Sequence, residues 1–311
     1  MKSHRNPSRP LGVGIQLPEV ERVVRWPEIK AMAVLAEQVG FDSLWLGNHL
    51  LYRQASGEVL GPWETWTSLA SLATVTDKVF IGPLVAATSF HHPTMLAKMA
   101  STIDDISDGR LIVGLGAGWN ETEYRAFGFP YDHRVSRFEE AFTIIRRLLA
   151  QEVVDFQGLY YQIEHCELQP RRARPGSPPL MVGSVGSRML RATLPYVQLW
   201  NAWFNAFGNT PDGVKPLLEK VNRECEALGR NPAEVSRTVA LLVQAPGGTG
   251  RQAGEPENPE IIPISGEPGA VADRLSAFAA SGIDHVQLVL DPITLGSIEW
   301  CAAIIETLDA G

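Results

Sequence analysis

Short apolar runs alternate with helical patterns along almost the whole chain, and this alternation restricts the possible folds more than any other feature. A core strand of a parallel sheet reads as a continuous apolar run, and a helix usually connects it to the next strand. Eight such runs occur, at residues 12–17, 43–47, 79–85, 111–115, 179–182, 197–203, 237–244 and 285–290. Eight strand–helix units predict an α/β fold, a (β/α)8 TIM barrel with insertions.

The competing fold is a doubly wound open sheet. That fold normally has fewer repeats and a GxGxxG turn directly after its first strand. The segment after residues 12–17 continues as PEVERVVRW and lacks this turn. The sequence therefore favours the barrel.

Helical patterns follow the strands at regular intervals. After the first strand, Pro27 suits the first turn of a helix, apolar residues from Ile29 to Val39 recur at helical spacing, and Gly40 is placed to end the helix. Further helices are predicted at residues 64–75, 93–106, 134–150, 186–194, 211–228, 268–280 and 295–308.

Two segments depart from the regular order. Residues 153–168 alternate in character around Gly158, which predicts an inserted hairpin. Residues 245–263 are rich in Gly, Pro and Glu, which predicts a mobile loop, either a lid over an active site or an insertion without function. We expect one barrel domain over residues 1–311, with residues 1–10 as a disordered tail.

Composition excludes several classes of function. The net charge is −8 and no basic stripe is present, so nucleic acid is not an expected partner. The three cysteines are scattered without a CxxC pair, which fits a reduced, cytoplasmic compartment better than a disulfide framework. No apolar run reaches the roughly 18 residues of a membrane span, and the polar start MKSHRNPSRP does not resemble a signal peptide.

Residues 111–120, LIVGLGAGWN, combine a core strand with alternating glycines at its end. Glycine exposes bare backbone, so we expect a flat or anionic ligand to approach closely at this rim of the barrel. A second glycine-containing turn, Gly183-Ser184-Val185-Gly186, directly follows another strand and opens a helix. Free amides at a helix start attract phosphate, although many turns of this kind use glycine without binding anything.

Active sites of such barrels lie at the carboxyl ends of the strands. His49 follows the second strand and His91 and His92 follow the third. His49 is a candidate acid–base residue, or it bonds a loop carbonyl; His92 is expected only to shape the helix entrance at Pro93, and the role of His91 stays open. No Asp or Glu stands beside these histidines at ligand spacing, so we expect no metal site.

Several strings resemble one family, the luciferase-like flavin and deazaflavin oxidoreductases of the bacterial luciferase superfamily. They are spread over most of the chain and include LAEQVGFDSLWLGNHL, GLGAGWNETEYRAFG, RFEEAFTIIRRLL and PPLMVGSVGSRMLRAT. The resemblance implies a (β/α)8 barrel that binds FMN or the deazaflavin coenzyme F-420 at the carboxyl end of the barrel. The GAGWNETEY form is similar to the branch that uses coenzyme F-420.

The resemblance also implies roles for particular residues. Asn48 and His49 would lie beside the tricyclic ring, and a non-proline cis peptide between Leu84 and Val85 would support the back of the ring. Cofactor-lining and phosphate-holding positions are implied as well, at Ala117, Gly118, Trp119, Gly183, Ser184 and Gly186. Many relatives carry Asp where this chain has Asn48, and some sugar-phosphate dehydrogenases carry Glu where it has Trp119, which argues against their substrate.

The hypothesis that follows is hydride transfer between a small organic substrate and a bound deazaflavin, with His49 as proton donor or acceptor. An FMN-dependent luciferase-like monooxygenase is the first alternative. A non-catalytic flavin-binding protein is the second. Relatives are often homodimers, so we expect a homodimer, and the substrate is not identified by the sequence.

Overall fold

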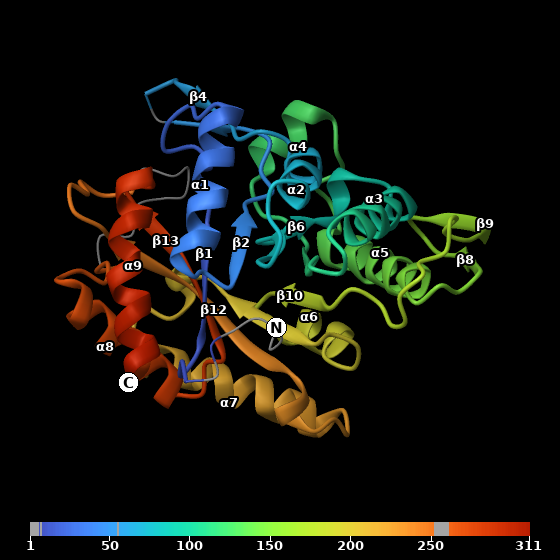
Figure 1. The fold of residues 1–311 in the computed structure, drawn as a ribbon. Helices are drawn as coiled ribbons and strands as arrows, with labels where there is room; N and C mark the ends of the chain where they lie inside the picture. Colours follow the sequence, from blue (N-terminus) through green and yellow to red (C-terminus); the bar gives the residue numbers. More distant parts are fainter. Residues whose placement is uncertain (1–5, 7, 55, 252–260) are drawn as a thin grey trace.

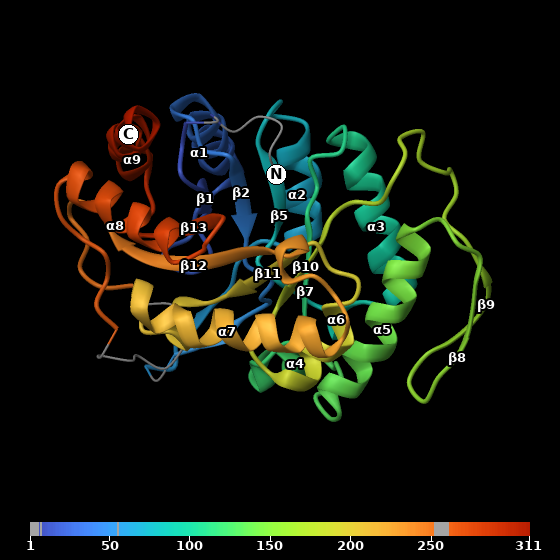
Figure 2. The ribbon, with the colours of Figure 1, turned by 90° about the horizontal axis from the view of Figure 1, so that it is seen from below.

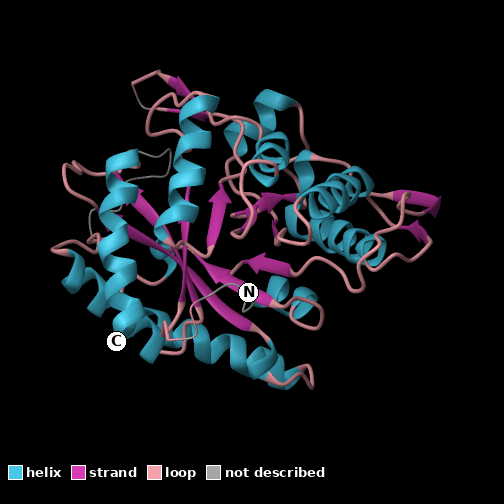
Figure 3. Ribbon diagram, in the orientation of Figure 1, coloured by secondary structure: helices cyan, strands magenta, loops and turns pink. Residues whose placement is uncertain are grey.

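Parallel strands form the centre of the fold, and helices surround them (Figures 1 and 3). The computed structural model describes residue 6 and residues 8–54, 56–251 and 261–311. The strands of the central sheet are β1 (Gly12–Gln16), β2 (Ser43–Leu46), β5 (Phe80–Pro83), β6 (Ala86–Ala87), β7 (Val113–Gly116), β10 (Leu180–Gly183), β11 (Leu199–Ala202), β12 (Ser236–Gln244) and β13 (His285–Asp291). Within the described residues they form a nine-stranded sheet in the order β5-β2-β1-β13-β12-β11-β10-β7-β6.

The sheet closes because its two edge strands come from one segment. β5 ends at Pro83 and β6 begins at Ala86, on either side of the Leu84–Val85 peptide. β6 pairs with β7, while a parallel bridge between Ile81 and Leu111 joins β5 to the residues that lead into β7. This confirms the predicted barrel and excludes the open sheet. The prediction of one continuous third strand over residues 79–85 was wrong, since this strand is split in two.

Nine helices are present among the described residues, and those that follow barrel strands agree closely with the sequence patterns. They are α1 (Trp26–Val39), α2 (Thr65–Ala73), α3 (Pro93–Ile106), α4 (Glu121–Phe127), α5 (Arg134–Leu149), α6 (Ser187–Thr193), α7 (Pro211–Ala227), α8 (Pro268–Ala280) and α9 (Leu295–Ala310). α1 shows why: Pro27 stands in its first turn, Ile29 and Met32 are buried against the strands, and Gly40 ends it in the left-handed conformation with φ of 97°.

A polar and aromatic cluster fills the barrel interior at the amino ends of the strands. His285 lies 2.8 Å from Ser43 Oγ, which also accepts a hydrogen bond of 2.6 Å from Trp45 Nε1. A Cβ on Gly12 or Gly14 would collide with the His285 ring, so these glycines make room for it. Because this end is filled, a ligand can enter the barrel only at the carboxyl ends of the strands.

Two short antiparallel ribbons and the short helix α4 add to the regular strand–helix units. The hairpin predicted at residues 153–168 is confirmed as β8 (Val154–Gln157) and β9 (Gln162–Cys166), and it extends beyond α5 at one edge of the molecule (Figure 2). A small antiparallel ribbon of β3 (Tyr52–Arg53) and β4 (Val59–Leu60) lies between β2 and α2 in the chain. The ribbon and α4 were not predicted, and both contribute to the site described below.

The two segments expected to be irregular differ in outcome. The expectation of a disordered tail over residues 1–10 was wrong for Arg9, which is buried and pairs with Asp42 at 2.9 Å and Asp309 at 2.7 Å. Residues 1–5 and 7 lie outside the described residues, as do residues 252–260 of the expected loop at 245–263. The described part of that loop returns to the barrel through a bridge between Val243 and Ile264. Among the described helices, none is both long and apolar enough to cross a membrane.

Candidate active site

A cavity of about 500 Å³ lies at the carboxyl ends of the barrel strands. Its volume falls in the range of roughly 300–1,000 Å³ that is usual for small-molecule and cofactor sites. Every predicted site residue lines this cavity: Asn48, His49, Leu84, Val85, Ala117, Gly118, Trp119, Gly183, Ser184 and Gly186. The structure therefore brings these residues together, and their roles toward a ligand stay predictions.

The Val85 side chain forms an apolar wall of the cavity. The peptide between Leu84 and Val85 is cis, as the family resemblance implies. A Cβ added at Gly116 would lie 2.9 Å from Val85 Cγ2, and one added at Gly183 would lie 2.7 Å from it. Val85 thus fills the space beside Gly116 and Gly183, although both glycines line the cavity, and the close approach of a ligand to them stays a prediction. Gly186 differs, since a Cβ there would meet Ser184 Oγ at 3.7 Å and nothing closer.

Asn48 is buried and uses both ends of its amide. Its Oδ1 accepts a hydrogen bond of 2.9 Å from the backbone N–H of Ala87, and its Nδ2 donates to Thr65 Oγ1 at 3.1 Å. The bond to Ala87 joins the end of β2 to β6, the strand that follows the Leu84–Val85 segment between β5 and β6. Asn48 therefore positions the backbone of this wall in addition to lining the cavity.

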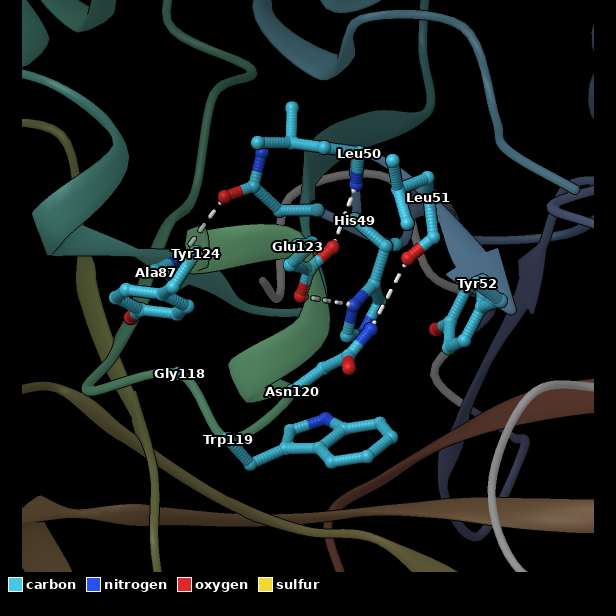
Figure 4. A network of polar contacts seen from close by, with 12 residues as sticks. His49, Leu50, Leu51, Tyr52, Ala87, Gly118, Trp119, Asn120, Glu123 and Tyr124 are labelled. Carbon is cyan, nitrogen blue, oxygen red and sulfur yellow. Dashed lines mark hydrogen bonds and ion pairs between the residues drawn. The ribbon is translucent and has the colours of Figure 1, made fainter. Parts of the chain in front are cut away.

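His49 is held by a carboxylate that sequence analysis missed. His49 Nδ1 lies 2.9 Å from Glu123 Oε1, and Glu123 Oε2 accepts a hydrogen bond of 2.7 Å from the backbone N–H of Leu50 (Figure 4). The Glu123 side chain is 1% exposed and the His49 side chain 18% exposed. The sequence did contain a signal for the helix that carries Glu123. Asn120 and Gly128 stand at the two ends of this short helix, and Glu123 lies in its first turn.

Two aromatic rings flank His49. The ring centroids of Tyr52 and Trp119 lie 4.8 and 5.5 Å from that of His49. The Trp119 residue is 41% exposed, so its face is available at the cavity mouth. The imidazole is therefore fixed on one side by Glu123 and enclosed by these rings.

Gly118 and Tyr124 hold the turn before α4. Gly118 has φ of 74°, and a Cβ there would lie 2.1 Å from the Tyr124 hydroxyl, so glycine is required on both counts. The Tyr124 hydroxyl donates to the carbonyl of Ala117 at 2.9 Å. Burial raises the pKa of Tyr124 to about 12, which keeps the phenol protonated as a structural donor at neutral pH.

Two side chains of the scaffold bind backbone carbonyls in the turn at residues 183–186. Trp200 Nε1 donates to the Ser184 carbonyl at 2.7 Å, and Lys220 Nζ donates to the Val185 carbonyl at 2.8 Å. Both carbonyls are therefore engaged by the scaffold. Phosphate binding by Gly183, Ser184 and Gly186 remains a prediction.

Another part of the cavity lining carries an ion-pair cluster that was not predicted. The Arg251 guanidinium lies 3.2 Å from Glu19 and 3.0 Å from Glu21, and its side chain is 5% exposed. Gln16 Nε2 donates to Glu19 at 3.1 Å, and the Trp203 ring lies beneath Arg251 at 5.4 Å. The Arg251 contacts with Glu19 and Glu21 join residues more than 200 positions apart, so no local pattern in the sequence could indicate them.

The two other histidines considered from the sequence, His91 and His92, lie outside the cavity lining. Trp45 and Trp66 are buried in the core, whereas Trp119 and Trp203 line the cavity. Among the described residues, no group of three or more His, Cys, Asp or Glu side chains could hold a metal ion.

A sequence model of the luciferase-like monooxygenase family matches residues 10–246. The chain belongs to this family. Among curated relatives of this luciferase-like protein, pyrimidine monooxygenase RutA of Caulobacter sp. is 31% identical over 210 residues, which cover 63% of this chain and 57% of RutA. A phthiodiolone/phenolphthiodiolone dimycocerosates ketoreductase of Mycobacterium tuberculosis is 28% identical over 284 residues, 83% of this chain and 70% of the ketoreductase. The matches to three RutA proteins span 57%, 59% and 60% of their lengths.

Solved structures share the fold over nearly the whole luciferase-like chain. An F-420-dependent secondary alcohol dehydrogenase superposes with a TM-score of 0.81 at 18% identity, covering 96% of this chain and 99% of the other. EDTA monooxygenase from Chelativorans sp. superposes with a TM-score of 0.78 at 13% identity, covering 97% and 94%. At these identities the likeness shows the fold.

Replacement of Gly116 by Ala tests the packing beneath Val85. We expect Gly116→Ala to lower the free energy of unfolding by about 1–3 kcal/mol, because the added methyl forces Val85 or the strand to move. Gly269→Ala is the matched control, since a Cβ there meets nothing within 4 Å. Chemical denaturation measures both. A second substitution, Val85→Ala, should recover much of the loss; a loss that Val85→Ala leaves unchanged would contradict the assigned contact.

His91 generates a prediction about pH. Burial lowers its pKa below the ordinary value of 6.5, so as the pH falls the unfolded chain takes up the proton first. The stability that neutral His91 contributes is complete above about pH 6.5 and is lost as the pH falls toward the folded pKa.

Denaturation of the wild type and His91→Asn at pH 7.5 and 5.5 measures this effect. We expect a smaller loss of stability on acidification in His91→Asn. His133→Asn, at a side chain that is 65% exposed, should behave as the wild type. Equal losses in the wild type and His91→Asn would contradict the assignment.

Proposed function

We propose that this luciferase-like protein is an oxidoreductase that transfers a hydride between the deazaflavin coenzyme F-420 and a small organic substrate. The observation that carries the proposal is the placement of the His49–Glu123 pair and the Val85 wall in one cavity. The coenzyme, when bound, supplies hydride acceptance or donation at its central ring. The chain's own residues bind and orient the reactants and handle the proton.

The residues present fit a planar cofactor. Val85 and Leu84 form an apolar wall with packing support from the glycines beneath it, and Trp119 offers an exposed aromatic face. At Gly186 the backbone is open to close approach, in a turn whose carbonyls are already bonded to Trp200 and Lys220. We assign the ring to the Leu84–Val85 wall and the phosphate to the turn at residues 183–186.

His49 is the residue proposed to exchange a proton with the substrate. Imidazole changes its charge near neutral pH, and His49 lines the cavity. Asn48, which neighbours it, is an amide and cannot act as a carboxylate base. A substrate oxygen or nitrogen that gains or loses a proton during hydride transfer would therefore do so at His49.

The names of the relatives support two candidate functions. The ketoreductase that aligns over 83% of this chain is named for reduction of a carbonyl, which agrees with hydride and proton transfer. The RutA proteins are named monooxygenases, and their identity reaches 31% over a shorter segment. An FMN-dependent monooxygenase is therefore the second candidate function.

Cofactor titration separates the two candidates. We expect the cofactor-free protein to bind F-420 tightly and FMN more weakly, as measured by fluorescence quenching and by the rise in melting temperature with ligand concentration. Tight FMN binding without F-420 binding would reverse the order of the candidates. Binding without turnover of any alcohol, ketone, imine, enone or aldehyde would instead indicate a non-catalytic flavin-binding protein.

Replacement of His49 tests its role in proton transfer. We expect His49→Gln to lower kcat by about 10²–10⁴-fold, the usual contribution of a general acid or base, while the Kd of the coenzyme changes only a few-fold. His133→Gln, outside the cavity, is the control and should retain full activity. Undiminished kcat in His49→Gln would remove this residue from the mechanism.

A further inference from the structure

Glu123 makes two hydrogen bonds that together constrain the proton on His49. Its Oε2 accepts from the backbone N–H of Leu50 at 2.7 Å, and its Oε1 lies 2.9 Å from His49 Nδ1. Figure 4 shows the carboxylate between these two partners, at the start of α4. The side chain is 1% exposed, so water does not compete for these oxygens.

We propose that Glu123 is a positioning residue that fixes the tautomer of His49, with the proton on Nδ1. A backbone N–H can only donate, so Leu50 fixes one carboxylate oxygen as its acceptor. The other oxygen of the ionised carboxylate then accepts from Nδ1–H, which leaves Nε2 as the basic nitrogen of the neutral ring. In the proposed function, Nε2 is then the nitrogen that would accept a proton from an O–H or N–H group of the substrate.

The surrounding rings keep this arrangement. Tyr52 and Trp119 lie 4.8 and 5.5 Å from the imidazole, centroid to centroid, and reversal of the ring would replace Nδ1 by carbon opposite Glu123. The loss of this charge-assisted hydrogen bond at a buried carboxylate disfavours the reversed ring. The catalytic consequence rests on the proposed function, whereas the tautomer itself does not.

Glu123→Gln should reverse the tautomer with almost no change in shape. The Leu50 N–H still requires an acceptor, so the amide oxygen of Gln stays on Leu50 and the amide NH₂ faces His49. Two donors cannot face each other, so Nδ1 must lose its proton and the neutral ring becomes Nε2–H. In serine proteases an amide in place of the carboxylate that orients the catalytic histidine lowers kcat by about 10⁴-fold through the wrong tautomer.

The matched control is Glu121→Gln on the same helix. Glu121 is 45% exposed and pairs with Arg125 on the outer side, away from the cavity lining. The substitution removes the same charge from the same helical turn without touching His49. We expect it to leave both the tautomer and kcat unchanged.

Nitrogen-15 NMR of the cofactor-free protein reads the tautomer directly. The chain has seven histidines, and the His49 signals are those that vanish in His49→Gln. Above the pKa of the ring, we expect Nδ1–H in the wild type and in Glu121→Gln, and Nε2–H in Glu123→Gln. A wild-type Nε2–H form would overturn the proposal, because a protonated Glu123 would then be donating to a bare Nδ1. The same tautomer in the wild type and Glu123→Gln would also overturn it.

The NMR result does not depend on which coenzyme or substrate is used, so failure of the proposal and failure of the proposed function are distinguishable. If Glu123→Gln does not fold, the wild-type tautomer alone decides. Where turnover is available, Glu123→Gln should lower kcat by about 10²–10⁴-fold, in the range of general acid–base contributions, with KM and coenzyme Kd nearly unchanged. A rise in KM at constant kcat would mean that Glu123 serves only binding.

Discussion

The Val85 side chain needs glycine beneath it, and this requirement shapes the upper rim of the barrel. A side chain at Gly116 or Gly183 would occupy the space that Val85 fills. Because these glycines end β7 and β10, the chain can cross over their ends between β5 and β6 without opening the sheet. The Leu84–Val85 segment then presents apolar side chains to the cavity instead of a row of backbone groups. The wall of the site and the closure of the barrel therefore depend on the same packing contact.

A second series of contacts links this rim to His49. The left-handed conformation of Gly118 turns the chain after β7, and the Tyr124 hydroxyl bonds back to Ala117 across that turn. α4 is thereby placed with Glu123 facing the end of β2. The carboxylate receives one backbone N–H and one imidazole nitrogen, which satisfies a buried charge. The position of His49 is thus determined by the strand end that carries it and by a helix that starts from another strand.

The sequence predicted the barrel because each strand–helix unit carries its own local signals, such as Pro27 and Gly40 at the ends of α1. Part of the cavity lining was also predictable, since strand ends in a parallel barrel meet at one rim, and the family resemblance added Leu84 and Val85. Partners from distant segments were not: Glu123 reaches His49 through a short helix, and Arg251 reaches Glu19 across 232 positions. The glycine of β7 at the cavity, Gly116, was located correctly, but the local sequence did not show that the Val85 side chain packs beside it.

The hydrogen bonds of Asn48 require an amide at this position. The Thr65 hydroxyl donates its single proton to the carbonyl of Gly47, so it can only accept from Asn48, and the Ala87 N–H can only donate to it. The position therefore needs one donor and one acceptor, which an amide provides and an ionised carboxylate does not. Asn48 therefore has no titratable proton, and its amide is fully engaged in holding β2 to β6 and to Thr65. In the proposed function, the proton would then be exchanged at His49, whose imidazole is held by the buried carboxylate of Glu123.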